Sequence, residues 1–285
     1  MNKKLLDKIK LLRVKTGACM VHCKKALIET SYDLDEAVLY LRKKGFAIAL
    51  KRNSKTALAG MISVLLDNDG KNAVILEVNC ETDFVARSSC FIAYVSNLLK
   101  LFLYDDSFNE NFYMLHNELC SYKKINDDRL DLISKVKENI IIKRIKRINI
   151  TTGKLHYYVH GGSDIGKIGA VLSVDNNLEN YFDLVKDISM QIVAMNPKYL
   201  NIEDIPLNII SKEKQLYFET IKDKYVDKND FVIKKVIFGQ LKKFYKDTVL
   251  LEQIFIKNSK LLVKDVIGEK FKLLNFTRFE VGENV

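Results

Sequence analysis

The chain has 285 residues, 48% of them hydrophobic and 29% charged, a composition that argues against disorder and allows two or three globular domains. No apolar run approaches the ~20 residues of a membrane-spanning helix, and the N-terminus lacks the apolar core of a signal peptide, so we expect a cytoplasmic protein with no membrane partner. The formal net charge of +10 favours an anionic partner, but a chain rich in Lys, Asn and Ile also acquires such an excess from composition alone.

The five cysteines are an odd number, which argues against a disulfide framework and predicts reduced thiols. Cys19 and Cys23 lie four residues apart, but a structural zinc site needs about four ligands and no second pair follows. The sequence therefore predicts no metal site.

The first 55 residues predict a small helical module and a polar linker. Apolar residues recur at helical spacing, Thr16–Gly17 interrupts them, and Asp33–Glu36 has the pattern of a helix start. Gly45 is expected to end the last helix. The helical segments and the linker are expected at residues 5–12, 20–30, 33–45 and 51–55.

A β-hairpin is predicted next. Met61–Leu66 and Ala73–Val78 are apolar runs of strand length, and Asp67–Gly70 between them readily supplies the positive φ angles of a tight turn. The apolar spacing of Phe91–Phe102 then predicts a helix.

The densest basic stretch is Ile140–Ile148, where apolar and basic residues partly alternate. A strand with one solvated face has this pattern, and a face that binds RNA has it too. The pattern favours the solvated strand and leaves RNA binding open.

A similar order of elements recurs in the second half. Lys154–His160 and Ile168–Val174 are predicted strands, and Tyr181–Met195 is a predicted helix that Asn196–Pro197 stops. The core is therefore expected to hold two related α+β halves.

Residues 205–245 change to helical spacing, with two apolar stripes separated by the polar turn Asp227–Asp230. Two antiparallel helices that project as a hairpin fit this pattern. Such an arm either packs on its own domain or presents apolar surface to a partner, and the sequence leaves both open.

An enzyme would need chemistry that the sequence does not show. Gly161–Lys167 has the spacing of a phosphate-binding loop, but Ile168 replaces the Ser or Thr that the motif requires, and a strand rather than a helix is predicted to follow. We interpret the stretch as a glycine-rich turn between strands. The four histidines are scattered, and only His160, before Gly161, has a distinctive setting, which fits an ordinary surface or core residue somewhat better than an interface contact.

Phe84 lies where a predicted strand passes to a predicted helix, beside Asp83. It precedes Phe91 by seven residues, so an early start of the helix would place both rings in the core. A later start would leave Phe84 free to enter another protein. The local pattern does not decide between the two.

Three separated motifs closely resemble the bacterial elongation factor Ts family and occur in that family's order. They are Thr16–Ala18 with Cys23–Leu27, Leu76–Ala86, and Arg278–Gly282. His160–Gly161, Asn196–Pro197 and Leu241–Phe244 fall where the family has comparable segments, so the resemblance covers nearly the whole chain.

The resemblance implies a guanine-nucleotide exchange factor for elongation factor Tu, the GTPase that carries aminoacyl-tRNA to the ribosome. The expected partner forms are GDP-bound and nucleotide-free. Such a protein needs no catalytic residue and no cofactor, which agrees with the missing enzyme chemistry. Direct contact with nucleic acid stays open.

The resemblance also implies an α+β fold with an inserted arm, the arm being a candidate for dimerisation. The expected parts are a ubiquitin-associated-like module of three helices at 1–54, a two-part core at 55–140 and at 141–204 with 245–285, and an antiparallel helical hairpin at 205–244.

By the same resemblance, Thr82, Asp83, Phe84 and Val85 displace the magnesium ion of the partner GTPase, with Phe84 inserting between its helices. The further residues expected to bind the partner are Val14, Thr16, Gly17, Met20, His160 and Gly161. Where the family has Gly-Glu-Asn this chain has Lys137–Asn139, so contacts that need that glycine's backbone are not assumed.

Overall fold

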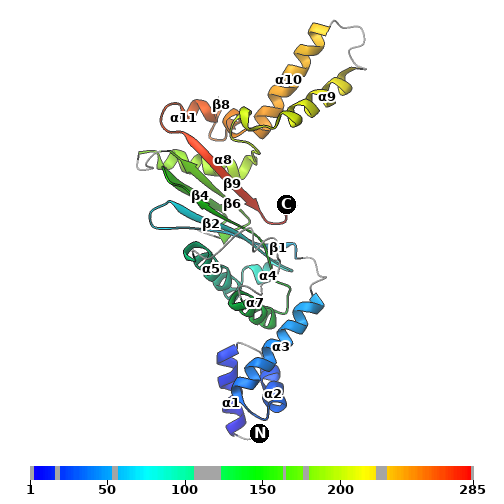
Figure 1. Ribbon diagram of the computed structural model, residues 1–285, viewed down its shortest axis with the longest axis vertical. Helices are drawn as coiled ribbons and strands as arrows, with labels where there is room; N and C mark the ends of the chain where they lie inside the picture. The colour runs from blue at the N-terminus through cyan, green and yellow to red at the C-terminus, as the bar shows by residue number, and fades with distance from the viewer. Residues whose placement is uncertain are drawn as a thin grey trace.

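A computed structural model describes residues 3–16, 20–52, 57–105, 123–162, 165–175, 180–222 and 230–283. Helices α1 to α3 lie at one end of the molecule, a helical hairpin lies at the other, and two β-sheets lie between them (Figure 1). The fold is therefore mixed α+β, with N-terminal helices and antiparallel sheets as predicted. How the chain divides into domains stays a prediction.

The N-terminal helices have a small core of their own. They are α1 (Lys3–Thr16), α2 (Met20–Glu29) and α3 (Leu34–Arg52). Their buried side chains include Leu12, Leu27 and Leu41. Asp33 begins α3 as expected, because its carboxylate accepts hydrogen bonds from the backbone N–H groups of residues 35 and 36 at 2.9 and 2.8 Å.

The prediction that Gly45 ends α3 is wrong, since the helix continues to Arg52. A glycine inside a helix costs only about 1 kcal/mol relative to alanine, and the residues after Gly45 are mostly good helix formers. The expected linker therefore begins inside the helix, and residues 53–56 lie outside the described part of the chain.

The first sheet is antiparallel, with the order β3-β2-β1-β5. Its strands are β1 (Ala59–Leu66), β2 (Asn72–Cys80), β3 (Ile141–Asn149) and β5 (Ile165–Gly166). The predicted hairpin is confirmed, because β1 and β2 pair in register across the turn, where Gly70 has a φ of +62°.

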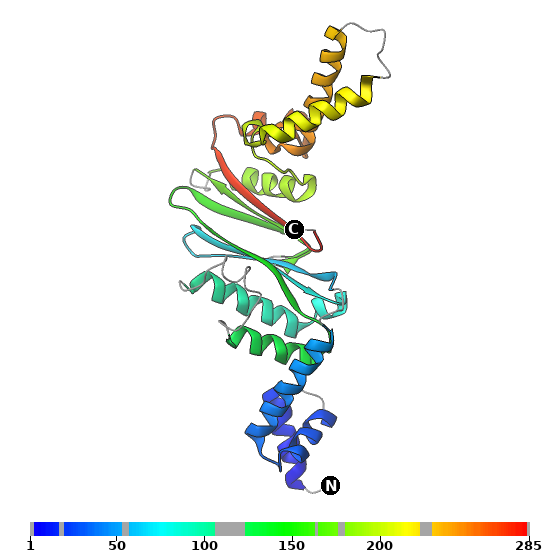
Figure 2. The same ribbon diagram turned by 45° about the vertical axis from the view of Figure 1, so that its right-hand side comes forward.

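Helices cover one face of this sheet (Figure 2). They are α4 (Asp83–Ala86), α5 (Ser89–Tyr104) and α7 (Lys123–Val136). The predicted helix at Phe91–Phe102 is confirmed as part of α5, whereas α7 was not predicted. Its buried Ile125, Leu132 and Ile133 were the available signal.

The second sheet is also antiparallel, with the order β4-β6-β9. Its strands are β4 (Lys154–His160), β6 (Ile168–Val174) and β9 (Leu273–Glu280). Helix α8 (Phe182–Met195) covers its outer face and ends as predicted at Asn196, whose φ of +46° is left-handed. Strand β9 was not predicted.

The two sheets pack face to face through a separate apolar cluster that includes Ile62, Ile75, Val159 and Val171. The core therefore has helices on the outside and two sheets inside (Figure 2). That the core consists of two related α+β halves stays a prediction.

The projecting hairpin consists of α9 (Leu207–Lys222) and α10 (Asp230–Thr248), which lie side by side as predicted (Figure 1). The shorter elements near its base are η3 (Ile202–Asp204), η4 (Leu250–Glu252), β7 (Ile254–Phe255), β8 (Asn258–Leu262) and α11 (Val263–Ile267). Within the described ranges, every helix is too short or too polar to cross a membrane.

Candidate functional site

Phe84 lies on α4, a single helical turn between β2 and α5. Thr82 caps this turn, because its side chain accepts a hydrogen bond from the backbone N–H of Val85. Ser88 then caps α5 in the same way, so α4 and α5 are separate helices. The seven-residue spacing consequently does not align Phe84 with Phe91: Phe84 is 89% exposed, and Phe91 is fully buried.

The opposite side of α4 anchors it to the protein. Ala86 is buried in the core beneath the first sheet, and half-buried Val85 packs against the same core. The turn therefore rests on small apolar contacts while the ring of Phe84 faces solvent.

Glu138 holds the start of α4. Its two carboxylate oxygens accept hydrogen bonds from the backbone N–H and the hydroxyl of Thr82, at 2.9 and 2.6 Å. A reciprocal bond runs from the backbone N–H of Asn139 to the carboxylate of Glu81, at 2.8 Å. These three hydrogen bonds to carboxylates fix the end of β2 against the segment after α7.

Lys137 has a φ of +62°, the left-handed region that favours glycine. By the resemblance given in the sequence analysis, a glycine is expected at this position. The lysine nevertheless adopts the backbone conformation that a glycine would supply, and Glu138 still reaches Thr82.

Lys167 holds the next residue of α4. Its ammonium forms an ion pair with the carboxylate of Asp83 and donates a hydrogen bond to the carbonyl of Gly60 at 3.0 Å. The hydrogen bond and the charge of Lys167 lower the pKa of Asp83 below its usual value. Asp83 therefore stays ionised at neutral pH. Its carboxylate faces Lys167, at the junction of the two sheets.

Lys167 is the lysine of the rejected phosphate-binding pattern. Its side chain is engaged with protein groups, and strand β6 begins at the next residue, Ile168. The prediction of a turn is confirmed for Gly161 and Gly162, which follow β4 directly, whereas Ile165 and Gly166 of the same stretch form the short strand β5. Residues 163 and 164 lie outside the described part of the chain.

A surface cleft of about 530 Å³ joins α4 to the turn after β4. Its lining includes Ala86 and Arg87 on one side and His160 and Gly161 on the other. His160 is exposed, and its Nδ1 lies 3.2 Å from the hydroxyl of Tyr158. The cleft thus places the predicted His160 and Gly161 beside the end of α4, whereas the predicted residues 82–85 are not among the residues that line it.

The predicted residues of the N-terminal helices lie elsewhere. Val14 is 86% exposed near the end of α1, and Met20 is exposed at the start of α2. Thr16 is half-buried, and its hydroxyl donates to the carbonyl of Leu12. Gly17 lies outside the described residues. In Figure 1 these helices are well separated from α4. A surface that includes the predicted residues of α1 and α2 together with those of α4 is therefore extended.

The basic stretch on β3 is not a continuous basic face. Arg144 is buried and pairs with Glu77 at 2.6 Å. Arg147 donates to the carbonyls of Leu103 and Asp105 at 3.2 and 3.1 Å. Two of the basic side chains therefore serve internal contacts, which favours the interpretation as a structural strand.

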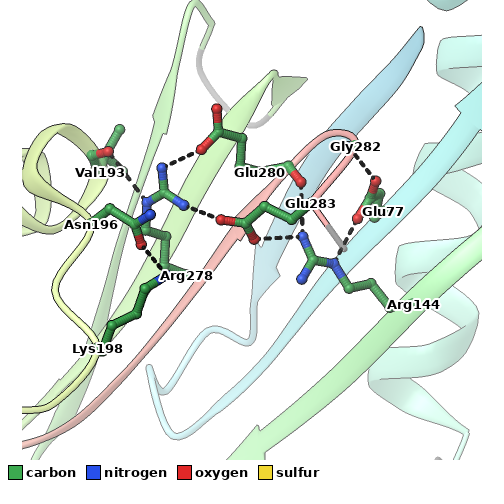
Figure 3. Close-up of polar contacts among 9 residues, drawn as sticks. All are labelled: Glu77, Arg144, Val193, Asn196, Lys198, Arg278, Glu280, Gly282 and Glu283. Carbon is green, nitrogen blue, oxygen red and sulfur yellow. Dashed lines mark hydrogen bonds and ion pairs between the residues drawn. The ribbon is translucent and has the colours of Figure 1, made fainter. Parts of the chain in front are cut away.

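An ion cluster that the sequence analysis missed joins the two sheets (Figure 3). Arg144 on β3 and Arg278 on β9 both bind the carboxylate of Glu283, at 3.0 and 2.5 Å. Glu77 on β2 is fully buried and also accepts the backbone N–H of Gly282 at 3.0 Å. A glutamate inside an apolar strand was the available signal, since buried charges are normally paired.

Of the described cysteines, Cys80 and Cys90 are free thiols. Burial raises the pKa of Cys80 to about 11, so this thiol beside the start of α4 stays protonated at neutral pH. The described His, Cys, Asp and Glu residues form no group of three or more that could hold a metal ion.

Comparisons with known proteins point to a single family. Residues 81–283 match the sequence model of the family described as Elongation factor TS. The chain is 34% identical over 293 aligned positions to Elongation factor Ts from Clostridium kluyveri, and 36% identical over 285 positions to that from Halothermothrix orenii. Both alignments cover 97% of this chain and 92% of the relative.

Proposed function

Because the chain belongs to the elongation factor Ts family, and is therefore a nucleotide-exchange factor of translation elongation rather than an enzyme, we propose that α4 carries its exchange activity. The partner is elongation factor Tu, met in its GDP-bound form and held in its nucleotide-free form. In this proposal Phe84 enters the GTPase and the segment from Thr82 to Val85 displaces its magnesium ion. The reaction belongs to the cytoplasm, where translation takes place.

The observation that carries this proposal is the exposure of Phe84 on a turn that is held from both sides. An aromatic ring in water contributes almost nothing to the stability of its own chain, whereas its burial in a partner is worth about 1.5 to 3 kcal/mol. The contacts of Glu138 and Lys167 keep the turn in place while the ring stays free. The arrangement favours a role in another protein's interior.

Thermodynamic linkage explains how such a contact promotes exchange. Magnesium bridges the diphosphate to the GTPase, so a partner that favours the metal-free site weakens the binding of GDP. GDP must weaken the binding of the exchange factor by the same factor. Neither step requires an acid, a base or a nucleophile from this chain.

We further propose that the cleft residues His160 and Gly161 and the N-terminal residues Val14, Thr16, Gly17 and Met20 contact the same GTPase. The exposure of Val14 and Met20 supports a contact of the helices α1 to α3, which we interpret as a ubiquitin-associated-like module. The proposed domain division is the one expected from the sequence, at 1–54, 55–140, 141–204 with 245–285, and 205–244.

The hairpin α9–α10 is proposed to dimerise the complex. Leu216, Phe218 and Phe238 are exposed on it, which supports contact with another protein more than packing on its own core. Whether nucleic acid also binds is left to experiment.

Release of a fluorescent GDP analogue from elongation factor Tu tests the role of Phe84. Phe84→Ala should lower exchange efficiency about ten- to a hundredfold, the equivalent of losing one buried ring. Its own stability should stay unchanged, because the ring is exposed in the free protein. Tyr104→Ala is the matched control, since Tyr104 is an exposed aromatic at the far end of α5. Unaltered exchange by a folded Phe84→Ala variant would refute the proposal.

A further inference from the structure

Lys167 occupies the point where the chain passes from the first sheet to the second. Gly166 before it pairs with β1 of the first sheet, and Ile168 after it pairs with β9 of the second. Its carbonyl accepts the backbone N–H of Val281 at 2.9 Å, just beyond β9. The residue is therefore held in place by both sheets before its side chain makes any contact.

The side chain of Lys167 links α4 to this fixed backbone position. Its ammonium bonds the Gly60 carbonyl on β1 and the carboxylate of Asp83, the first residue of α4. A four-residue helix has too few internal hydrogen bonds to hold its own direction. The direction of the turn, and with it the direction of Phe84, depends on its external contacts.

The external contacts of α4 hold different parts of the turn. Glu138 fixes where α4 begins, and buried Ala86 fixes where it ends. Among the polar side-chain contacts described for α4, the ion pair of Asp83 ties the turn to Lys167 and through it to β1, at the junction of the two sheets. We propose that Lys167 is a positioning residue for nucleotide exchange, which holds Asp83 and so sets the direction in which Phe84 meets the GTPase. The inference rests on the proposed role of Phe84.

Exposure separates this role from a purely structural one. The side chains of Lys167 and Asp83 are 47% and 56% exposed, and ion pairs this open to solvent add little to folding stability. Without Lys167, α4 samples several directions, and the apparent affinity falls by the fraction of molecules that point Phe84 correctly. Once the ring is seated in the partner, the contact is no longer needed.

The test measures exchange over a range of GDP-bound elongation factor Tu concentrations. Lys167→Ala should raise KM about fivefold, near the upper end of what an exposed ion pair contributes, and leave the maximal rate close to wild type. Lys167→Arg, which keeps the charge and the donors, should restore most of the loss. Lys264→Ala is the matched control, because Lys264 is similarly exposed and pairs with Glu252 at 2.7 Å, away from α4.

A double-mutant cycle asks whether Lys167 acts through Phe84. In a Phe84→Ala background, Lys167→Ala should have no further effect on KM. Additive losses would show that Lys167 touches the partner directly, and would overturn the inference. So would a Lys167→Arg variant as defective as Lys167→Ala.

Hydrogen exchange of the free protein separates this inference from the proposal on which it rests. The N–H groups of Ala86 and Arg87 bond back to residues 82 and 83 at 3.2 and 3.1 Å, so they report on α4 without any partner. Lys167→Ala should reduce their protection, with the urea midpoint unchanged. Unaltered protection would overturn the positioning role even if Phe84 proves essential. If Lys167→Ala lowers the protection of these N–H groups but Phe84→Ala leaves nucleotide exchange unchanged, the function proposed for Phe84 is refuted instead.

Discussion

His156 on β4 shows how burial decides what a titratable residue can do. It is nearly inaccessible, its Nδ1 lies 2.9 Å from the hydroxyl of buried Ser189, and its ring packs edge-on against Phe182 at 5.3 Å. Burial, with a smaller contribution from the charge of Lys186, lowers the pKa of His156 to about 4. The residue is neutral in the folded protein across the physiological range.

This burial predicts a pH-dependent stability. The unfolded chain binds a proton at His156 below about pH 6.5, while the folded protein stays neutral until about pH 4, so the free energy of unfolding falls as the pH drops between these values. The full loss is about 3 kcal/mol for this shift. Urea unfolding at about pH 5 and about pH 7.5 should show the part of this loss that is complete by pH 5, about 2 kcal/mol.

His156→Gln should remove that part of the pH dependence, whereas His160→Gln, at an exposed histidine of the same strand, should leave it in place. An identical pH dependence in wild type and His156→Gln would show that His156 does not couple folding to protons.

At the scale of elements, the hairpin α9–α10 projects from the fold and packs little against it. Most of its side chains are exposed, and Leu241 near its base is a buried exception. Its large exposed residues include Phe218 on α9 and Phe238 on α10. Apolar side chains in these positions can be covered by a second molecule.

Sedimentation of the wild-type complex with elongation factor Tu is expected to show a concentration-dependent dimer. Phe238→Glu should weaken it at least tenfold, because a charge without a partner is costly to bury in an apolar interface. Lys234→Glu, an exposed position on the same helix, controls for the change in charge. A complex that sediments as one copy of each chain at every concentration contradicts the dimer.

The elements also show which local signals were sufficient. The β1–β2 hairpin and the end of α8 were predictable because Asp67–Gly70 and Asn196–Pro197 act through neighbouring backbone angles. Gly45 was misjudged, because a glycine only weakens a helix whose other residues support it. Strand β9 was missed, because its pairing with β6 depends on residues about a hundred positions earlier.

At the scale of the whole molecule, the ion cluster of Figure 3 ties the two sheets together at the C-terminal edge. Burial raises the pKa of Glu283, but the guanidinium groups of Arg144 and Arg278 more than offset this and hold it below its usual value. Glu77 is buried deeper and depends on Arg144 and the N–H of Gly282. The cluster is satisfied only when both sheets are in place.

Arg144→Met should therefore lower the free energy of unfolding by about 3 to 5 kcal/mol, because it leaves the charge of Glu77 buried without its partner. Lys143→Met, at an exposed neighbour on the same strand, should change stability by less than about 0.5 kcal/mol. Urea unfolding measures both variants.

A second substitution tests the reason for that loss. Arg144→Met combined with Glu77→Leu removes both charges and should recover part of the stability. A double variant as unstable as the sum of its parts would mean that packing, and not the unpaired charge, explains the effect.

One part of the candidate site could be predicted from the sequence, and another part could not. The residues of α4 and of the turn after β4 were predictable, because each group belongs to a short sequence motif. The contacts of Glu138 and Lys167 with α4 were not predictable, because each joins segments 56 or 84 positions apart. Such contacts form only after the strands have paired into sheets and brought these distant segments together, so the sequence alone does not indicate them.

By itself, the sequence determined the N-terminal helices, the strands β1, β2, β3, β4 and β6, the projecting hairpin and the family, because these depend on local periodicity and on motifs in order. Only the tertiary structure decided whether Phe84 belongs to this protein's core. The caps at Thr82 and Ser88 separate α4 from α5, and the ring consequently faces solvent. The ion pair at Lys167 and the buried arginines were likewise decided by packing, since a charge finds its partner only after the two sheets meet.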